Sequence, residues 1–218
     1  GIAEAEAMEK KAEAYAKYNK AAVAEMMIKV LPDIAAKVAE PLGQIDKITI
    51  IGGGDGGAIR ELVRYPLVEH IDLVEIDELV VEVCKKHLPQ TACCFNDDRV
   101  TVHYQDGLKF IRRCENEYDL IIVDSTDPFG PGEGLFTKEF YGNCYKALKE
   151  DGIMVNQHES AFYLDDAVAM QRAHKRIVES FPISRVYQAH IPTYPSGHWL
   201  FGFASKKYHP IEDLKAVK

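Results

Sequence analysis

Short apolar runs alternate with amphipathic stretches from residue 45 to near the end of the chain. The apolar runs predict strands over 47–51, 70–76, 99–104, 118–124 and 152–157. The stretches between them predict helices over 58–65, 77–88, 108–112 and 137–150. Strands that alternate with helices are typical of a parallel sheet with helices on its faces. A helix over 165–180 follows, and then two strands, 184–191 and 198–205, that we expect to be antiparallel neighbours.

The first 44 residues have a different pattern, rich in Ala, Glu and Lys and almost without strand-like alternation. No Gly or Pro interrupts residues 3–30, which therefore predict a long helix. Pro32 suits the first turn of a second, short helix that ends near residues 41–43. We therefore predict a helical extension over 1–44 and an α/β domain over 45–218.

The chain carries a formal net charge of −8, from 34 acidic and 26 basic residues, and 47% of its residues are hydrophobic. This balance is typical of a folded soluble domain and argues against nucleic-acid binding, which usually needs a basic surface. No apolar run reaches the roughly 18 residues of a membrane span, and no secretory signal pattern begins the chain. The five cysteines have no CxxC spacing, and the eight histidines have no HExxH motif. We expect free thiols, a cytoplasmic location and no metal site.

Gly52 and Gly54 belong to a GxGxxG motif that directly follows the first predicted strand. Glycines permit a tight turn there and let a cofactor lie against the backbone. Glu75 ends the next strand, about 20 residues further on, where a carboxylate can hold the hydroxyls of a ribose. The motif does not distinguish NAD from S-adenosylmethionine, and a plain tight turn followed by a surface acid is the alternative.

Asp106 and Gly107 follow the third predicted strand. The Asp106 carboxylate can accept a hydrogen bond from an adenine amino group, and Gly107 lets the ring approach. Asp106 is equally suited to cap the following helix, and its two oxygens allow both roles at once.

The segment DSTDPFGPGE, residues 124–133, places Asp124 and Asp127 after a strongly apolar strand. Pro128 favours extended backbone at Asp127, so both carboxylates are expected to face the crevice at the carboxyl edge of the sheet, although a plain turn is the alternative. Other acids are expected at the same edge, namely Asp55, Glu133 and Glu159. The nearest basic residues lie inside helices. Such a site favours amines over phosphates and carboxylates, which argues against an NAD dehydrogenase.

Tyr194 and Trp199 lie beside a predicted turn near the end of the chain. They either pack between strands or form an aromatic wall against an aliphatic cation. His158 stands at a strand end, where we expect a structural or surface histidine.

Six segments together resemble the spermidine synthase (polyamine aminopropyltransferase) family over about residues 46–210: IIGGGDGG, LVEID, YQDG, YDLIIVDSTDPFGPGEGLFTKEFY, LKEDGIMVNQHES and IPTYPSGHW. The resemblance implies a Rossmann-like, methyltransferase-type fold with a mostly parallel sheet. It implies transfer of an aminopropyl group from decarboxylated S-adenosylmethionine, a co-substrate, to putrescine, giving spermidine and methylthioadenosine. It further implies a homo-oligomer without a prosthetic group or metal.

Matching positions carry the roles of the family's residues onto this chain. Asp124 matches the proton acceptor, and Asp127 matches the acid that orients the diamine. The resemblance assigns Glu75 to the ribose, and Asp106, Gly107 and Pro131 to the adenosine. It assigns Asp55 to the amine end of the donor or to the polyamine, and Tyr194 to the polyamine.

Residues 1 to about 50 instead resemble the carboxyl-terminal part of flotillins, notably in AEAEAMEKKAEAY and AEPLGQIDKITII. Members of the synthase family begin with a small β-rich domain that contacts the substrates, and its absence is expected to impair activity. Two alternatives follow: a methyltransferase that acts on a small amine, and a non-catalytic assembly module built on the flotillin-like helix. Contact of that helix with a membrane is not the favoured interpretation.

Overall fold

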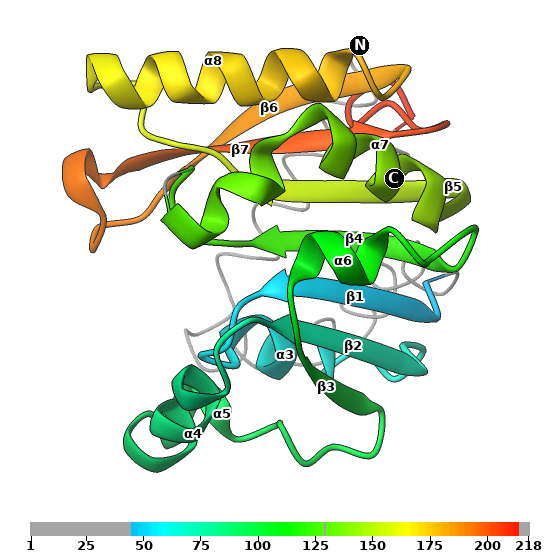
Figure 1. The fold of residues 1–218 in the computed structure, drawn as a ribbon, viewed down its shortest axis with the longest axis vertical. Coiled ribbons are helices and arrows are strands. Elements are labelled where there is room, and N and C mark those ends of the chain that lie inside the picture. Colours follow the sequence, from blue (N-terminus) through cyan, green and yellow to red (C-terminus); the bar gives the residue numbers. More distant parts are fainter. Residues whose placement is uncertain (1–44, 129, 214–218) are drawn as a thin grey trace, which may run out of the picture. The chain divides into compact units, whose positions relative to one another are not determined.

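The computed structural model describes residues 45–128 and 130–213. A sheet of seven strands forms the centre of this part of the chain, in the order β3-β2-β1-β4-β5-β7-β6 (Figure 1). The strands are β1 (Lys47–Gly52), β2 (His70–Glu75), β3 (Val100–Tyr104), β4 (Tyr118–Asp124), β5 (Leu148–Gln157), β6 (Ile183–His190) and β7 (His198–Ser205). The α-helices are α3 (Gly57–Leu62), α4 (Glu78–His87), α5 (Pro89–Ala92), α6 (Gly107–Ile111), α7 (Lys138–Ala147) and α8 (Leu164–Val178).

The first five strands are parallel, and β7 runs antiparallel to both β5 and β6. The predicted α/β class and the antiparallel pairing of the last two strands are therefore confirmed. Because parallel neighbours point the same way, the carboxyl ends of β1, β2, β4 and β5 meet at one edge of the sheet. The acids predicted from the sequence lie at those ends or in the loops that follow them: Glu75 and Asp124 end β2 and β4, and Asp55 lies in the loop after β1.

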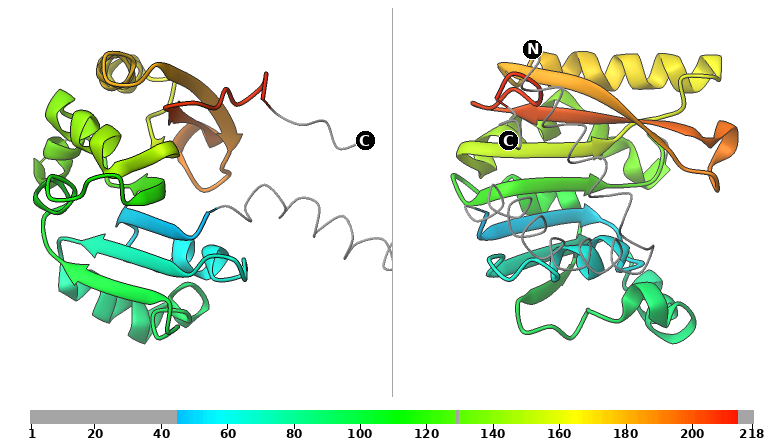
Figure 2. Two further views of the ribbon diagram at one scale, coloured as in Figure 1. Left: turned by 90° about the vertical axis from the view of Figure 1, so that its right-hand side faces the viewer. Right: turned by 180° about the vertical axis from the view of Figure 1, so that it is seen from behind.

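The side chains of the central strands point alternately to the two faces of the sheet, and each face packs into its own hydrophobic core. On β1, Ile48 and Ile50 pack with α3 and α4 residues, whereas Ile51 packs on the opposite face. The second core gathers side chains from α6, α7 and α8, among them Phe110, Phe140 and Ile177. Figure 1 shows α6 and α7 on the near face of the sheet, and Figure 2 shows α8 beside β6 from two further directions. Burial on both faces explains why these strands read as almost continuous apolar runs.

The predicted helix over 137–150 is wrong at its end, because α7 stops at Ala147 and β5 begins at Leu148. Leu148 has extended backbone angles, φ −71° and ψ 141°, and its side chain is fully buried. The backbone N–H groups of Asn116 and Glu117 donate to the carbonyls of Lys146 and Ala147 at 2.9 and 2.8 Å. Tertiary packing and these two hydrogen bonds therefore end the helix before the Asp-Gly signal in the sequence.

Three short helical segments were not predicted. They are α5 and two 3-10 helices, η2 (Gly130–Phe136) and η3 (Pro195–Gly197). Each is too short to show a repeating pattern of hydrophobic residues from which a helix can be predicted. The predicted helices within residues 1–44 lie outside the described residues.

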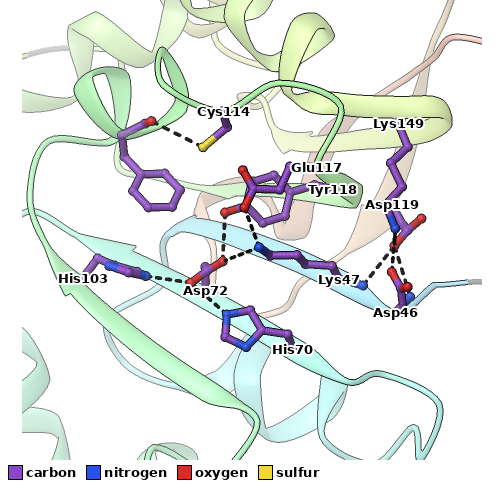
Figure 3. A network of polar contacts seen from close by, with 11 residues as sticks. Asp46, Lys47, His70, Asp72, His103, Cys114, Glu117, Tyr118, Asp119 and Lys149 are labelled. Carbon is purple, nitrogen blue, oxygen red and sulfur yellow. Dashed lines mark hydrogen bonds and ion pairs between the residues drawn. The ribbon is translucent and has the colours of Figure 1, made fainter.

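A buried carboxylate, Asp72, ties the three strands β2, β3 and β4 together (Figure 3). It accepts hydrogen bonds from Tyr118 Oη at 2.8 Å, His103 Nε2 at 2.6 Å and His70 Nε2 at 3.1 Å. The two histidines bind Oδ1, whereas Tyr118 binds Oδ2, from which Lys47 Nζ lies 3.9 Å away. Burial opposes the charge of Asp72, but these hydrogen bonds outweigh it, so that the pKa of Asp72 lies below its ordinary value.

Candidate active site

A pocket of about 450 Å³ lies at the carboxyl edge of the sheet. It is formed by the loops after β1, β2, β3 and β4, the end of β5 and the turn before β7. Of the predicted site residues, nine line this pocket: Gly52, Gly54, Asp55, Glu75, Asp106, Gly107, Asp124, Pro131 and Tyr194. The structure therefore brings nine of the ten predicted site residues together at one pocket, and Asp127 is the exception.

The glycine turn after β1 fits closely around its neighbours. Gly52 has φ +86°, a left-handed conformation that side chains rarely adopt. A Cβ added to Gly52 would lie 2.1 Å from the carbonyl oxygen of Asp124. One added to Gly54 would lie 2.7 Å from Glu75 Oε2. The turn therefore needs glycine for backbone geometry and for contact with two acids of the pocket.

Glu75 is held in place by backbone donors. Its Oε2 accepts from the Gly54 N–H at 3.2 Å, and its Oε1 accepts from the Asp77 N–H at 3.1 Å. The carboxylate is buried and lines the pocket beside the glycine turn. It thus has a fixed position from which it can accept hydrogen bonds from a pair of hydroxyls.

Asp106 caps helix α6, as one of its two predicted roles requires. Its Oδ1 accepts from the N–H groups of Leu108 at 2.8 Å and Lys109 at 3.2 Å. The same residue lines the pocket. Gly107 packs against β1, because an added Cβ would lie 2.4 Å from Ile51 Cγ2. The glycine is thus required by packing, in addition to any room that it leaves for a ligand.

Asp124 is the last residue of β4 and pairs in register with Gly52 of β1. A Cβ on Gly53 would lie 3.0 Å from Asp124 Oδ2, so the carboxylate rests against the glycine turn. Burial, and then the charges of Asp55 and Glu75, raise the pKa of Asp124. A carboxylate in these surroundings is a stronger base than an exposed one.

Asp127 does not line the pocket, in contrast to the expectation from the sequence. Its side chain is exposed on the loop beyond β4. It still lies close enough to Tyr194 and Glu159 to raise the pKa of each. Burial is the larger cause for both groups, and for Tyr194 the charges of Asp124 and Asp55 come next. The charges of all three predicted acids therefore act on Tyr194, although only Asp124 and Asp55 line the pocket.

Tyr194 packs against Trp199 and also lines the pocket. Its ring packs edge-on against Trp199, with 4.7 Å between the ring centroids, and Trp199 is buried. Tyr194 itself also lines the pocket, whereas Trp199 does not. The tryptophan thus has the packing role, and the tyrosine presents its polar end to the pocket.

Gln157 is a pocket residue that the sequence analysis missed. Its Nε2 donates to the Ser125 carbonyl at 3.2 Å, and its Oε1 accepts from Tyr194 Oη at 3.5 Å. It therefore connects the end of β5 with the loop after β4 and with the turn before β7. Gln157 ends β5, a strand parallel to β4, and this position in the sequence could have indicated that it belongs to the pocket.

Glu159 was predicted at this edge but given no role. Its carboxyl is buried, and Oε1 has no hydrogen-bond partner among the described residues. Burial, Asp127 and Asp166 raise the pKa of Glu159 to about 7. The neighbouring His158 is buried, which excludes the surface position considered for it, and burial and His174 lower its pKa to about 3. Glu159 does not line the pocket, but it lies two residues beyond the lining residue Gln157 in the chain and titrates near neutral pH.

The ionisable side chains that line the pocket are acidic. Its lining includes four carboxyl side chains and, within the described part of the chain, no Lys, Arg or His. This surface attracts cations and repels carboxylates and phosphates. Residues 45–128 and 130–213 contain no cluster of three or more His, Cys, Asp or Glu side chains arranged to hold a metal. None of the helices described is long and apolar enough to cross a membrane.

The fold and the site define an α/β domain of Rossmann type with an acidic ligand pocket at its glycine turn. Residues 22–215 match the family described as the spermine/spermidine synthase domain. This chain belongs to that family. The match begins at residue 22, earlier than the resemblance near residue 46 suggests. The flotillin resemblance of residues 1–50 stays a prediction.

Curated relatives and solved structures agree with this assignment. The polyamine aminopropyltransferase of Alkaliphilus oremlandii is 72% identical over 173 residues, which are 79% of this chain and 61% of the relative. That of Clostridium beijerinckii is 71% identical over 172 residues, again 79% and 61% of the two chains. The chain therefore spans about three fifths of the length of these relatives.

Two spermidine synthase crystal structures have the same fold. One, a complex with the transition-state analogue AdoDATO, has a TM-score of 0.76 and 47% identity, over 78% of this chain and 58% of that chain. The other, from Thermotoga maritima, has a TM-score of 0.72 and 44% identity, over 78% and 56%. The predicted Rossmann-like fold is confirmed.

Proposed function

We propose that this domain transfers an aminopropyl group from decarboxylated S-adenosylmethionine to putrescine, giving spermidine and methylthioadenosine. The observation that carries the proposal is the half-buried Asp124 carboxylate, which lies against the glycine turn in a pocket lined by three further acids. The family assignment and the curated relatives support the same reaction.

The donor has a nucleoside part and a cationic arm. In the proposal, Glu75 accepts hydrogen bonds from the two ribose hydroxyls, and Asp106, Gly107 and Pro131 contact the adenine. Asp55 pairs with the ammonium group of the aminopropyl arm. Ordinary S-adenosylmethionine carries a carboxylate on that arm, and Asp55 repels it.

The diamine occupies the other end of the pocket. Tyr194 and Gln157 lie there, hydrogen-bonded to each other. The charge of Asp127 acts on both Tyr194 and Glu159, because it adds to the effect of burial in raising the pKa of each. We assign Tyr194 and Gln157 to the reacting amine, and Asp127 with Glu159 to the charge of the diamine. The charge of Asp127 reaches Glu159, because it contributes to the raised pKa of that carboxyl group.

The chemical step is a nucleophilic substitution. Asp124 removes a proton from the attacking ammonium group, which leaves a lone pair on nitrogen. That nitrogen forms a bond to the methylene carbon beside the sulfonium, the carbon–sulfur bond breaks, and its electron pair stays on sulfur. Sulfur leaves as the neutral thioether of methylthioadenosine. The pocket must also hold two cations in line for the reaction. This positioning can lower the activation barrier by up to about 7–11 kcal/mol.

Transfer of a radiolabelled aminopropyl group to putrescine tests the proposal. We expect labelled spermidine from the chain as it stands, and about a 10²–10⁴-fold lower rate with Asp124→Asn, because the base is lost. Asp98→Asn, which changes an exposed carboxyl group outside the pocket, is the matched control and should leave the rate unchanged. Equal rates for Asp124→Asn and the unmodified chain would remove Asp124 as the base.

Methyl transfer is the rival reaction, and the same assay distinguishes it. A methyltransferase would transfer label from the methyl group of ordinary S-adenosylmethionine to the amine. We expect no such product, because the pocket has no basic side chain among its described lining residues to pair with the donor's carboxylate.

A further inference from the structure

Cys93 and Cys94 form a pair of adjacent thiols directly after α5, the short helix labelled in Figure 1. Their sulfur atoms lie 3.5 Å apart. Cys93 is exposed and Cys94 is partly exposed, whereas Cys84, Cys114 and Cys144 are buried. Neither Cys93 nor Cys94 lines the pocket, so the proposed transfer reaction leaves this pair without a role.

The spacing of the two sulfur atoms suits a bridging atom better than a disulfide bond. A disulfide requires about 2.05 Å between the sulfurs and usually 4.4–6.8 Å between the Cα atoms, but adjacent Cα atoms are only about 3.8 Å apart. A soft atom that binds each sulfur at about 2.3 Å separates the two sulfurs by about 3.3–3.8 Å. The observed distance falls in that interval, so capture needs little movement of the backbone.

The backbone around the thiols is well anchored. Cys93 has helical angles, φ −63° and ψ −20°, and its sulfur lies 4.0 Å from the Gln90 carbonyl oxygen. That oxygen also accepts from Arg60 Nη1 at 2.9 Å. Phe95 is buried on the other side of the pair. A fixed backbone on both sides holds the two sulfurs on one exposed surface.

We propose that Cys93 and Cys94 form a dithiol site that captures trivalent organoarsenicals, a class of soft, thiol-seeking reagents. In this step an arsenic oxide, R–As=O, reacts with two S–H groups. Two arsenic–sulfur bonds form, the arsenic–oxygen bond breaks, and the oxygen leaves with both protons as water. Arsenic remains trivalent, so the step needs no oxidant or reductant. The proposal is independent of the reaction assigned to the pocket.

Intact-mass measurement with phenylarsine oxide tests the site in the full chain. We expect one adduct per chain that survives excess 2-mercaptoethanol and is released by dithiothreitol, because only a second dithiol competes with a chelate. Peptide mapping should place the adduct on residues 93–94. Cys93→Ser and Cys94→Ser should each lose the stable adduct, while Cys84→Ser, which changes a buried thiol, should keep it.

Three results would contradict the proposal of a dithiol site. No stable adduct on the unmodified chain overturns the proposal, as does a stable adduct that persists in either Cys93→Ser or Cys94→Ser. Cys93 is exposed, so its serine variant should fold, and an unchanged thermal melting curve would confirm that it does. Mapping of the adduct in the unmodified chain to another cysteine also overturns it, without recourse to any variant.

Discussion

Asp124 lies directly opposite Gly52 in the parallel pairing of β4 with β1, and the two backbones touch where the pocket begins. An added Cβ on Gly52 would lie 2.1 Å from the Asp124 carbonyl oxygen and 3.2 Å from the Cα of Ser125. The glycine turn therefore sets the position of the proposed base as well as the shape of the nucleoside pocket.

Gly52→Ala should lower both stability and nucleoside binding. The φ of +86° and the clash with the Asp124 backbone are each unfavourable for alanine, and the backbone strain alone costs about 1–3 kcal/mol. Urea unfolding gives the stability, and calorimetry with methylthioadenosine gives the affinity. Gly142→Ala is the control: Gly142 is an exposed residue within α7 with nothing near its added Cβ. Gly142→Ala should raise the free energy of unfolding by about 0.5–1 kcal/mol, because alanine is more favourable than glycine inside a helix. Equal effects of the two substitutions would contradict this account of Gly52.

The acid limb of the pH–rate profile should depend on Asp55. Asp124 acts as a base only when it is deprotonated, so the rate rises with pH through its raised pKa. A neighbouring negative charge disfavours ionisation of the Asp124 carboxyl group, and the charge of Asp55 is one cause of the raised pKa of Asp124. Asp55→Asn should therefore shift the limb in kcat to lower pH, even though it weakens donor binding. A limb that stays in place or moves to higher pH would show that Asp55 does not act on the base.

Diamine affinity should increase with pH around neutrality. The pKa of Glu159 is about 7, so its carboxyl gains a negative charge between pH 6 and 8 while the diamine remains doubly protonated. Calorimetry of putrescine binding to the chain saturated with methylthioadenosine should show this increase. Glu159→Gln should flatten it. Glu133→Gln, which changes an exposed acid at the same edge, should keep it, because Glu133 is exposed whereas Glu159 is buried. A pH dependence that survives in Glu159→Gln would exclude Glu159 from the diamine site.

Stability at low pH should depend on the buried Asp72 network. The pKa of Asp72 is lower in the folded chain than its ordinary value, so the network stabilises the fold above that ordinary value and this stabilisation is lost as pH falls through the folded pKa. Tyr118→Phe removes a 2.8 Å hydrogen bond to the carboxylate and should cost about 1.5–3 kcal/mol at pH 7. The cost should shrink as Asp72 becomes protonated. Urea unfolding at pH 7 and near pH 3 measures both values.

Glu117→Gln provides the comparison for this network. Glu117 pairs with Lys47, but 38% of its side chain is exposed, so the change should cost only about 0–1 kcal/mol. If Glu117→Gln destabilised the chain as much as Tyr118→Phe, the Asp72 hydrogen bonds would not be the main source of stability here.

The sequence predicts the strands and the pocket because both follow from local rules. Apolar strands followed by Gly, Asp or Glu place those residues at one sheet edge, and the positions of Gly52, Glu75, Asp106 and Asp124 confirm this. The end of α7 was wrong because Leu148 is recruited into the sheet by packing, which local propensity does not encode. Gln157 was missed because its role comes from contacts with Ser125 and Tyr194, which lie 32 and 37 residues away in the chain.

Other predictions depend on features that the described residues do not contain. The helical extension, the flotillin resemblance, the homo-oligomer and the cytoplasmic location stay predictions. Asp127 is not in the pocket because only Asp124 is held by the sheet, as the last residue of β4, whereas Asp127 lies three residues further on in an irregular loop and is exposed.

Calorimetric comparison of decarboxylated and ordinary S-adenosylmethionine tests the central claim, that a carboxylate-lined pocket selects a donor without a carboxylate. The two ligands differ only in that group, and repulsion of one charge at close range is worth about tenfold or more in affinity. We predict that the decarboxylated donor binds at least that much more tightly, and that Asp55→Asn narrows the difference. Equal affinity, or tighter binding of ordinary S-adenosylmethionine, would contradict the account.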